Sequence, residues 1–118
     1  MAWHIVFHAQ EPEEWKVGGM WFVPEWANSN VISKRYKEEY SKTRPPLKVI
    51  LPSKHSQHGD VFVLDRFFSD DPDGRGWEVI IEGELVDGQT PNITLKPSIN
   101  CVGSYHGYIT NGVITDDC

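Results

Sequence analysis

A cluster of polar and aromatic side chains near the C-terminal end of the sequence is the most obvious place for chemistry or recognition. These residues are Ser98, Asn100, Ser104, His106 and Tyr108. Because side chains alternate between the two faces of a strand, Ser104, His106 and Tyr108 are expected to share one face. Hydroxyl, amide and imidazole groups together offer hydrogen-bond donors and acceptors to a ligand. The pattern therefore predicts an outward-facing binding surface.

The same stretch leaves a catalytic alternative open. His106 could act as a base, with Ser98, Ser104 or Cys101 as the nucleophile of a small hydrolase. The segment 103–107, Gly-Ser-Tyr-His-Gly, is not a nucleophile elbow, because an elbow has serine centrally between two glycines at a strand-to-helix turn. We therefore assign no catalytic residue from the sequence, and a non-enzymatic protein is the favoured prediction.

A second catalytic alternative is a zinc-dependent enzyme that uses His106. His55 and His58 are separated by two residues, and together with Cys101 and His106 they could supply four nitrogen and sulfur ligands to zinc. The chain contains no Cys-x-x-Cys pair, and residues 55–59 are equally typical of a polar turn. No metal ligand and no cofactor are assigned.

The charge is divided unevenly along the chain. The 118 residues include 11 Lys and Arg against 17 Asp and Glu, for a formal net charge of −6. Residues 1–59 hold 8 basic and 6 acidic side chains, whereas residues 60–118 hold 3 and 11. The acidic half includes Asp70, Asp71 and Asp73, and we expect this loop to dock on a basic surface of a protein partner.

Two tryptophans are expected to contribute to the same kind of interface. Trp15 and Trp26 lie among charged residues at the ends of predicted strands. A partly exposed indole in such a position is a common anchor of protein interfaces.

The segment from Lys34 to Lys54 is locally basic and supports a further alternative, nucleic-acid binding. Binding to a phosphate backbone needs several cations presented together. The basic residues of this segment are Lys34, Arg35, Lys37, Lys42, Arg44, Lys48 and Lys54. Because the rest of the chain is acidic, a protein partner remains the preferred prediction.

The length and composition predict a single globular domain over residues 1–118. A hydrophobic content of 39% with 24% charged residues is ordinary for such a domain. The apolar runs are far shorter than the roughly 20 residues needed to cross a membrane, and the first residues do not resemble a secretion signal. The two cysteines, Cys101 and Cys118, suit a reducing compartment. A cytoplasmic protein without a membrane partner is expected.

The predicted fold class is α+β with mostly antiparallel β-structure. One helix is expected over about residues 29–43, because Ile32, Tyr36 and Tyr40 recur every four residues and Asn28 or Ser29 can cap its start. Six to eight strands are expected in addition to this helix, the first of them over residues 4–8.

A C-terminal β-hairpin is the clearest local prediction. The dipeptide Asn111-Gly112 lies between two apolar, β-forming segments, over residues 105–110 and 113–115. Asn-Gly accepts the positive φ angles of a two-residue type I′ turn.

The second half of the chain resembles a family of small uncharacterised proteins from phages and prophages. The resemblance covers about residues 44–117, and its most specific parts are Pro-Ser-Ile-Asn at 97–100 and Gly-Ser-Tyr-His-Gly at 103–107. It implies a phage protein that acts in the cytoplasm of a bacterial host, with Ser98 and His106 as positions of interest. Some wider relatives look like zinc proteins with a central cysteine cluster, which this chain does not have.

Taken together, the sequence predicts a small phage-type binding module that contacts a host or phage protein and could inhibit a host function.

Overall fold

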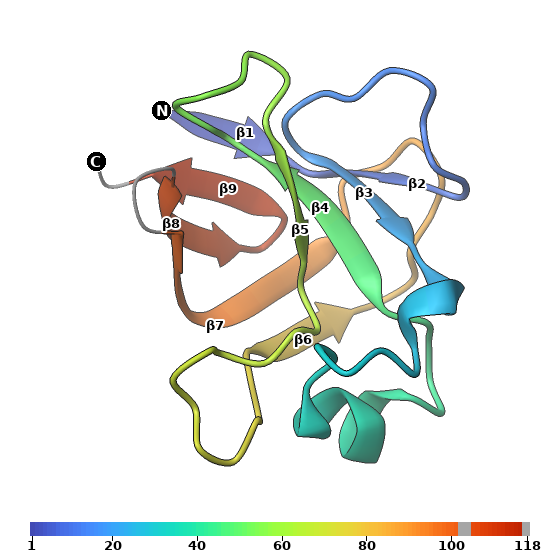
Figure 1. Cartoon of the computed structure of the whole chain (residues 1–118). Coiled ribbons are helices and arrows are strands. Elements are labelled where there is room, and N and C mark those ends of the chain that lie inside the picture. The colour runs from blue at the N-terminus through green and yellow to red at the C-terminus, as the bar shows by residue number, and fades with distance from the viewer. Residues whose placement is uncertain (102–104, 117–118) are drawn as a thin grey trace.

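The computed structural model describes residues 1–101 and 105–116, with the backbone alone at residue 101 (Figure 1). In these residues the strands form two sheets, one of five strands in the order β1-β9-β8-β7-β6 and one of four in the order β2-β3-β4-β5. The strands of the first sheet are β1 (Ala2–His4), β6 (Glu78–Glu82), β7 (Asn92–Cys101), β8 (Tyr105–Thr110) and β9 (Val113–Asp116). Those of the second are β2 (Val6–His8), β3 (Gly19–Phe22), β4 (Leu47–Leu51) and β5 (Asp60–Val63).

The chain passes from one sheet to the other at Ile5. The backbone N–H of Ile5 donates to the carbonyl of Gly112 at 2.7 Å, whereas the N–H of Val6 donates to the carbonyl of Gly18 at 2.9 Å. The single strand expected over residues 4–8 is therefore two short strands in different sheets. Of the strand pairs, β2 with β3 is parallel and the others are antiparallel.

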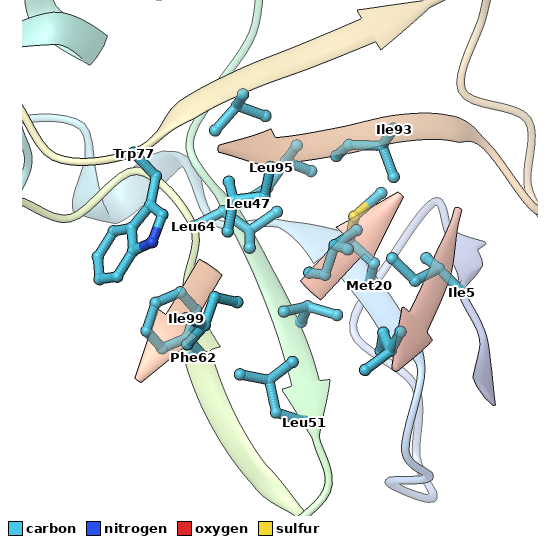
Figure 2. Packing of buried hydrophobic residues seen from close by; sticks show 14 of the residues in the cluster. Ile5, Met20, Leu47, Leu51, Phe62, Leu64, Trp77, Ile93, Leu95 and Ile99 are labelled. Atoms are coloured by element: carbon cyan, nitrogen blue, oxygen red, sulfur yellow. The ribbon is translucent and has the colours of Figure 1, made fainter. Parts of the chain in front are cut away.

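The main hydrophobic core lies between the two sheets (Figure 2). Inward side chains of both sheets are almost completely buried, for example Leu47 and Val49 of β4 and Ile93 and Leu95 of β7. Alternation along each strand sends every second residue into this core, so burial of the apolar face holds the two sheets together. The predicted predominance of antiparallel β-structure is confirmed.

The helix predicted over residues 29–43 is much shorter in the structure. Helical backbone spans residues 34–40, including a π-helical turn η2 (Tyr36–Tyr40), and a 3-10 turn η1 (Pro24–Trp26) precedes it. Ile32 forms an isolated antiparallel bridge with Arg66, and the backbone N–H of Ser33 donates to the carbonyl of Asp65. These contacts hold the backbone in a non-helical conformation up to residue 33.

The cap of this short helix is Ser33, not Asn28 or Ser29. The Ser33 hydroxyl oxygen accepts the backbone N–H of Tyr36 at 3.1 Å, which is the usual N-cap interaction. The fold is consequently a β-structure with little helix, and the α part of the α+β prediction is only weakly supported.

The predicted C-terminal hairpin is present. Strands β8 and β9 pair from Thr110 with Val113 onward, and the two turn residues Asn111 and Gly112 have φ angles of 49° and 80°. Positive φ at both positions is the requirement that the Asn-Gly dipeptide meets.

Candidate functional site

A groove of about 780 Å³ lies where β6 approaches the end of β3 and the segment after η2. It is larger than the hollows beside His106 and beside Trp77, which measure about 420 and 530 Å³. The groove is lined by Phe22, Tyr40, Thr43, Arg44, Val79, Ile80, Ile81, Gly83, Glu84 and Leu85. A mainly apolar hollow of this size with a few polar groups is typical of a binding site.

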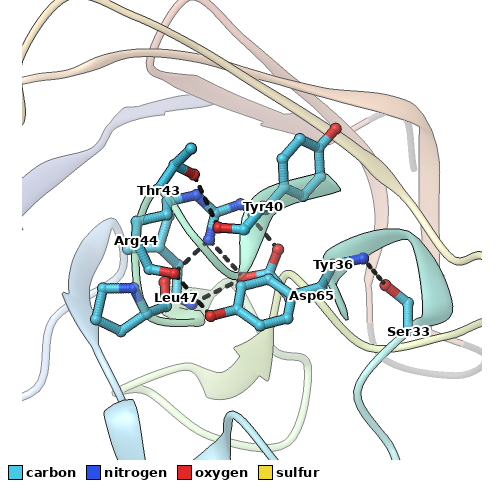
Figure 3. A network of polar contacts seen from close by, with 8 residues as sticks. Ser33, Tyr36, Tyr40, Thr43, Arg44, Leu47 and Asp65 are labelled. Atoms are coloured by element: carbon cyan, nitrogen blue, oxygen red, sulfur yellow. Dashed lines mark hydrogen bonds and ion pairs between the residues drawn. The ribbon is translucent and has the colours of Figure 1, made fainter. Parts of the chain in front are cut away.

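Arg44 at the side of the groove is held by a nearly buried ion pair (Figure 3). Its guanidinium donates two parallel hydrogen bonds of 2.9 Å to the two carboxylate oxygens of Asp65, whose side chain is 1% exposed. Asp65 also accepts the backbone N–H of Leu47 at 2.9 Å. A bidentate pair of this kind is strong and geometrically specific. The positive charge of Arg44 is thus already neutralised inside the protein.

Two tyrosines complete the polar network around Arg44. The guanidinium carbon lies 5.6 Å from the ring centre of Tyr36 and 5.1 Å from that of Tyr40, within the range of cation–π contacts. The hydroxyl of Tyr36 donates to the carbonyl of Arg44 at 2.7 Å. The network joins the segment 33–44 to the ends of β4 and β5.

The environment of both tyrosines keeps their hydroxyls neutral. Burial raises the pKa of Tyr40, and the backbone N–H of Val79, which donates to its hydroxyl, opposes this effect. Burial also raises the pKa of Tyr36, to which the nearby negative charge of Asp65 adds. Tyr40, which lines the groove, therefore presents a phenol and not a phenolate at neutral pH.

The residues predicted as a binding surface are brought together only in part. Asn100 of β7 and His106 of β8 are direct cross-strand partners, and Tyr108, 47% exposed, lies on the same face of β8 as His106. Ser104 lies outside the described residues.

Although Asn100 and His106 are cross-strand neighbours, they line different hollows. Ser98 and Asn100 line a hollow with Phe62 and Trp77, where the indole N–H of Trp77 donates to the Ser98 carbonyl. His106 is half-buried and lines a separate hollow near the N-terminal strand β1.

The zinc alternative gains no assembled metal site in the described residues. Among these side chains, no three of the His, Cys, Asp and Glu residues stand close enough together to hold a metal ion. His55 and His58 are exposed in the loop between β4 and β5. The side chain of Cys101, the proposed fourth ligand, lies outside the described residues, so the zinc hypothesis stays a prediction.

The acidic loop has an internal structural role at Asp71. Its carboxylate accepts the backbone N–H groups of Asp73 at 2.9 Å, Arg75 at 3.0 Å and Gly76 at 3.2 Å. These hydrogen bonds, led by the one from Asp73, hold the pKa of Asp71 below its usual value. Asp70 and Asp73 are exposed, so two of the three predicted docking carboxylates face solvent.

The predicted interface tryptophans differ in exposure. Trp15 is 40% exposed, and its ring centre lies 6.0 Å from that of the buried Trp21. Trp26 is half-buried, and the ammonium group of Lys48 lies 5.0 Å from its ring centre. Trp15 is thus the more accessible of the two.

The basic segment of residues 34–54 does not present all its charges to solvent. Arg44 is paired with Asp65, Lys34 lies 3.7 Å from Glu38, and Lys48 packs over Trp26. A phosphate backbone would have to compete with these contacts, and the nucleic-acid hypothesis stays a prediction.

Sequence reasoning missed the groove altogether. Its lining comes from β3, from the turn after η2, from β6 and from the loop that follows β6. Of its lining residues, only Arg44 was singled out from the sequence as a candidate for binding, as one of the basic residues between Lys34 and Lys54.

Comparison of the chain with protein-family models, with curated proteins and with solved structures finds no significant match. The resemblance to phage proteins therefore stays a prediction. In the described part of the chain, no helix has the length and apolar character needed to cross a membrane.

Proposed function

We propose that this chain is a non-enzymatic binding module that takes apolar side chains of a protein partner into the groove beside β6. The proposal rests chiefly on one observation: the groove is mainly apolar, and Arg44, the one cation among the described residues that line it, is already engaged by Asp65. Apolar contacts can then supply affinity, while the few polar groups set orientation.

The composition of the groove favours binding over turnover. Its lining, as far as the described residues form it, contains no histidine, serine or cysteine. The two tyrosines nearest Arg44 have a raised pKa and so are poor bases at neutral pH. The hydrolase and zinc-enzyme hypotheses would have to rely on His106, which lies in a different hollow.

The setting of the proposed partner follows from the resemblance to phage proteins. We expect a host or phage protein in the bacterial cytoplasm, and inhibition of a host function is one result that such binding could have.

A matched pair of variants tests whether the groove binds a partner. Thr43 and Ser41 are both exposed, and each hydroxyl donates a 2.8 Å hydrogen bond to a backbone carbonyl, of Tyr40 and Lys37 respectively. Only Thr43 lines the groove. Thr43→Arg should obstruct the groove, whereas Ser41→Arg adds the same charge and bulk outside it.

The measurement is quantitative capture from bacterial lysate with the full chain as bait. We expect a partner that binds the wild type and Ser41→Arg equally and Thr43→Arg at least tenfold more weakly. Equal capture by all three proteins would rule out the groove as the binding site. Failure of the wild type to retain any stoichiometric partner would contradict the binding-module function itself.

A further inference from the structure

Strand β6 is an edge strand, and the direction of its backbone groups can be deduced from its neighbour β7. The N–H of Gly112 donates to the carbonyl of Ile93 at 2.8 Å, so Ile93 directs its backbone groups away from β6. Because these directions alternate along a strand, the backbone N–H and carbonyl of Thr94 point toward β6. There they pair with the backbone groups of Ile80, the register partner of Thr94. Val79 and Ile81 must then point their backbone groups outward, into the groove.

Tyr40 supports this deduction and marks one end of the open edge. Its hydroxyl accepts the backbone N–H of Val79, which requires that N–H to point away from β7. Within the described residues, no hydrogen bond is formed by the carbonyl of Val79 or by the N–H and carbonyl of Ile81 on this edge. Three main-chain groups are therefore open to an incoming strand.

The side chains of β6 alternate between two faces, and the two glutamates share their face with Ile80. Val79 and Ile81 pack against the core, so Glu78 and Glu82 lie on the opposite face of the strand. Glu84 follows in the groove lining. None of these three carboxylates forms an ion pair with another described residue.

We propose that the groove binds an extended, basic segment of a protein partner, which adds to β6 as a further strand. This inference rests on the proposed function and specifies its ligand. Apolar side chains of the segment would enter the groove opposite Val79 and Ile81. The central residue of the bound segment would lie opposite Ile80. Lysine or arginine side chains two positions before and two positions after it would lie beside Glu78 and Glu82, where opposite charges on neighbouring strands attract.

The charges also argue against a second copy of this chain as the occupant. Antiparallel pairing of two β6 strands would place the glutamates of one copy beside those of the other. Like charges in directly opposed positions are destabilising. A basic segment is favoured for the same reason.

The peptide Lys-Val-Thr-Val-Lys, acetylated and amidated at its ends and carrying a fluorophore, is the probe. In the proposed pairing both valines direct their N–H groups toward β6, and threonine directs its N–H away. N-methylation of both valines should weaken binding to the full chain at least tenfold in fluorescence anisotropy. N-methylation of threonine should change the affinity of the peptide by less than about threefold. A Glu-Val-Thr-Val-Glu peptide should bind at least tenfold more weakly than the basic one.

Two variants of the protein test the same contacts from the other side. Ile81→Pro removes the outward N–H, and proline is tolerated on an edge strand where that N–H is not used in the sheet. Ile81→Val keeps the N–H with a side chain of similar size. We expect at least a tenfold loss of peptide affinity for Ile81→Pro and little change for Ile81→Val. Glu82→Lys should lower the peptide affinity at least fivefold. Its control is Glu13→Lys, at an exposed position outside the groove.

The outcomes separate this inference from the proposed function. Equal binding of the two N-methylated peptides, preference for the acidic peptide, or no binding at millimolar peptide overturns strand addition. So does a wild-type dimer that Ile81→Pro dissociates, since the occupant is then a second copy. If Ile81→Pro does not fold, the N-methylated peptides still decide. The Thr43→Arg and Ser41→Arg comparison, which needs no peptide, tests the groove independently.

Discussion

Asp65 combines almost complete burial with three hydrogen bonds from two different partners. Substitution Asp65→Asn removes the negative charge but little volume, so Arg44 would remain as a buried cation without its counterion. We expect the free energy of unfolding to fall by about 3–5 kcal/mol, the usual cost of breaking one side of a buried pair. Urea unfolding measures this loss.

The exposed carboxylate of Asp73 provides the control for this experiment. Asp73→Asn makes the same chemical change in solvent and should alter stability by less than about 0.5 kcal/mol. A loss below 1 kcal/mol for Asp65→Asn would show that the ion pair with Arg44 contributes little to the fold.

The carboxylate of Asp71 leads to a prediction about how the stability of the folded loop depends on pH. Its pKa is lower in the folded chain than in the unfolded chain, because backbone N–H groups, that of Asp73 first, donate to its carboxylate. The ionised form therefore stabilises the folded loop above the unfolded-state pKa of about 3.9. This stabilisation is lost as the pH falls through the lower, folded-state pKa.

Carbon-13 NMR of the side-chain carboxyl groups measures this directly. The titration midpoint of Asp71 should lie below that of the same residue in the urea-unfolded chain. A folded-state midpoint equal to or above the unfolded one would contradict the hydrogen bonding described for the loop.

Among the elements, the hairpin of β8 and β9 depends on a glycine inside a strand. A Cβ atom on Gly107 would collide with the carbonyl oxygen of Thr115 and would lie 2.6 Å from the hydroxyl of Tyr105. That hydroxyl donates to the same Thr115 carbonyl at 2.6 Å. Tyr105 and Gly107 of β8 thus have a structural reason for their identities.

We expect Gly107→Ala to lower the free energy of unfolding by at least about 2 kcal/mol, because main-chain atoms cannot move away as a flexible side chain can. Thr110→Ala, at an exposed position on the same strand, should cost less than about 1 kcal/mol. Thermal and urea unfolding compare the two. Similar stabilities would show that β8 and β9 can separate enough to admit the methyl group.

The elements that were predicted correctly from the sequence are those that local residues determine. The hairpin was predicted correctly because Asn111 and Gly112 determine their turn locally. The helix was predicted too long because its start depends on the contacts of Ile32 with Arg66 and of Ser33 with Asp65. Those partners lie more than 30 residues away along the chain, and the helical spacing of apolar residues does not reveal them.

For the whole molecule, the location of hollows was beyond sequence reasoning. Asn100 and His106 were expected on one surface and are indeed register partners. The groove, in contrast, joins the end of β3 with β6, which belong to different sheets. No periodicity or motif connects Phe22 with Leu85, and only the packing of the two sheets brings them to the same place.

The pairing of β1 with β9 also has a consequence for biosynthesis. Trp3 opposes Ile114 in the five-stranded sheet, and the Met1 amino group lies 3.6 Å from the carboxylate of Asp116. Trp3 cannot meet this partner until residue 114 has emerged from the ribosome. Since contacts between distant positions slow folding, β1 should wait unpaired while the intervening hundred or so residues are translated. A nascent chain stalled before β9 would then leave Trp3 accessible to chaperones.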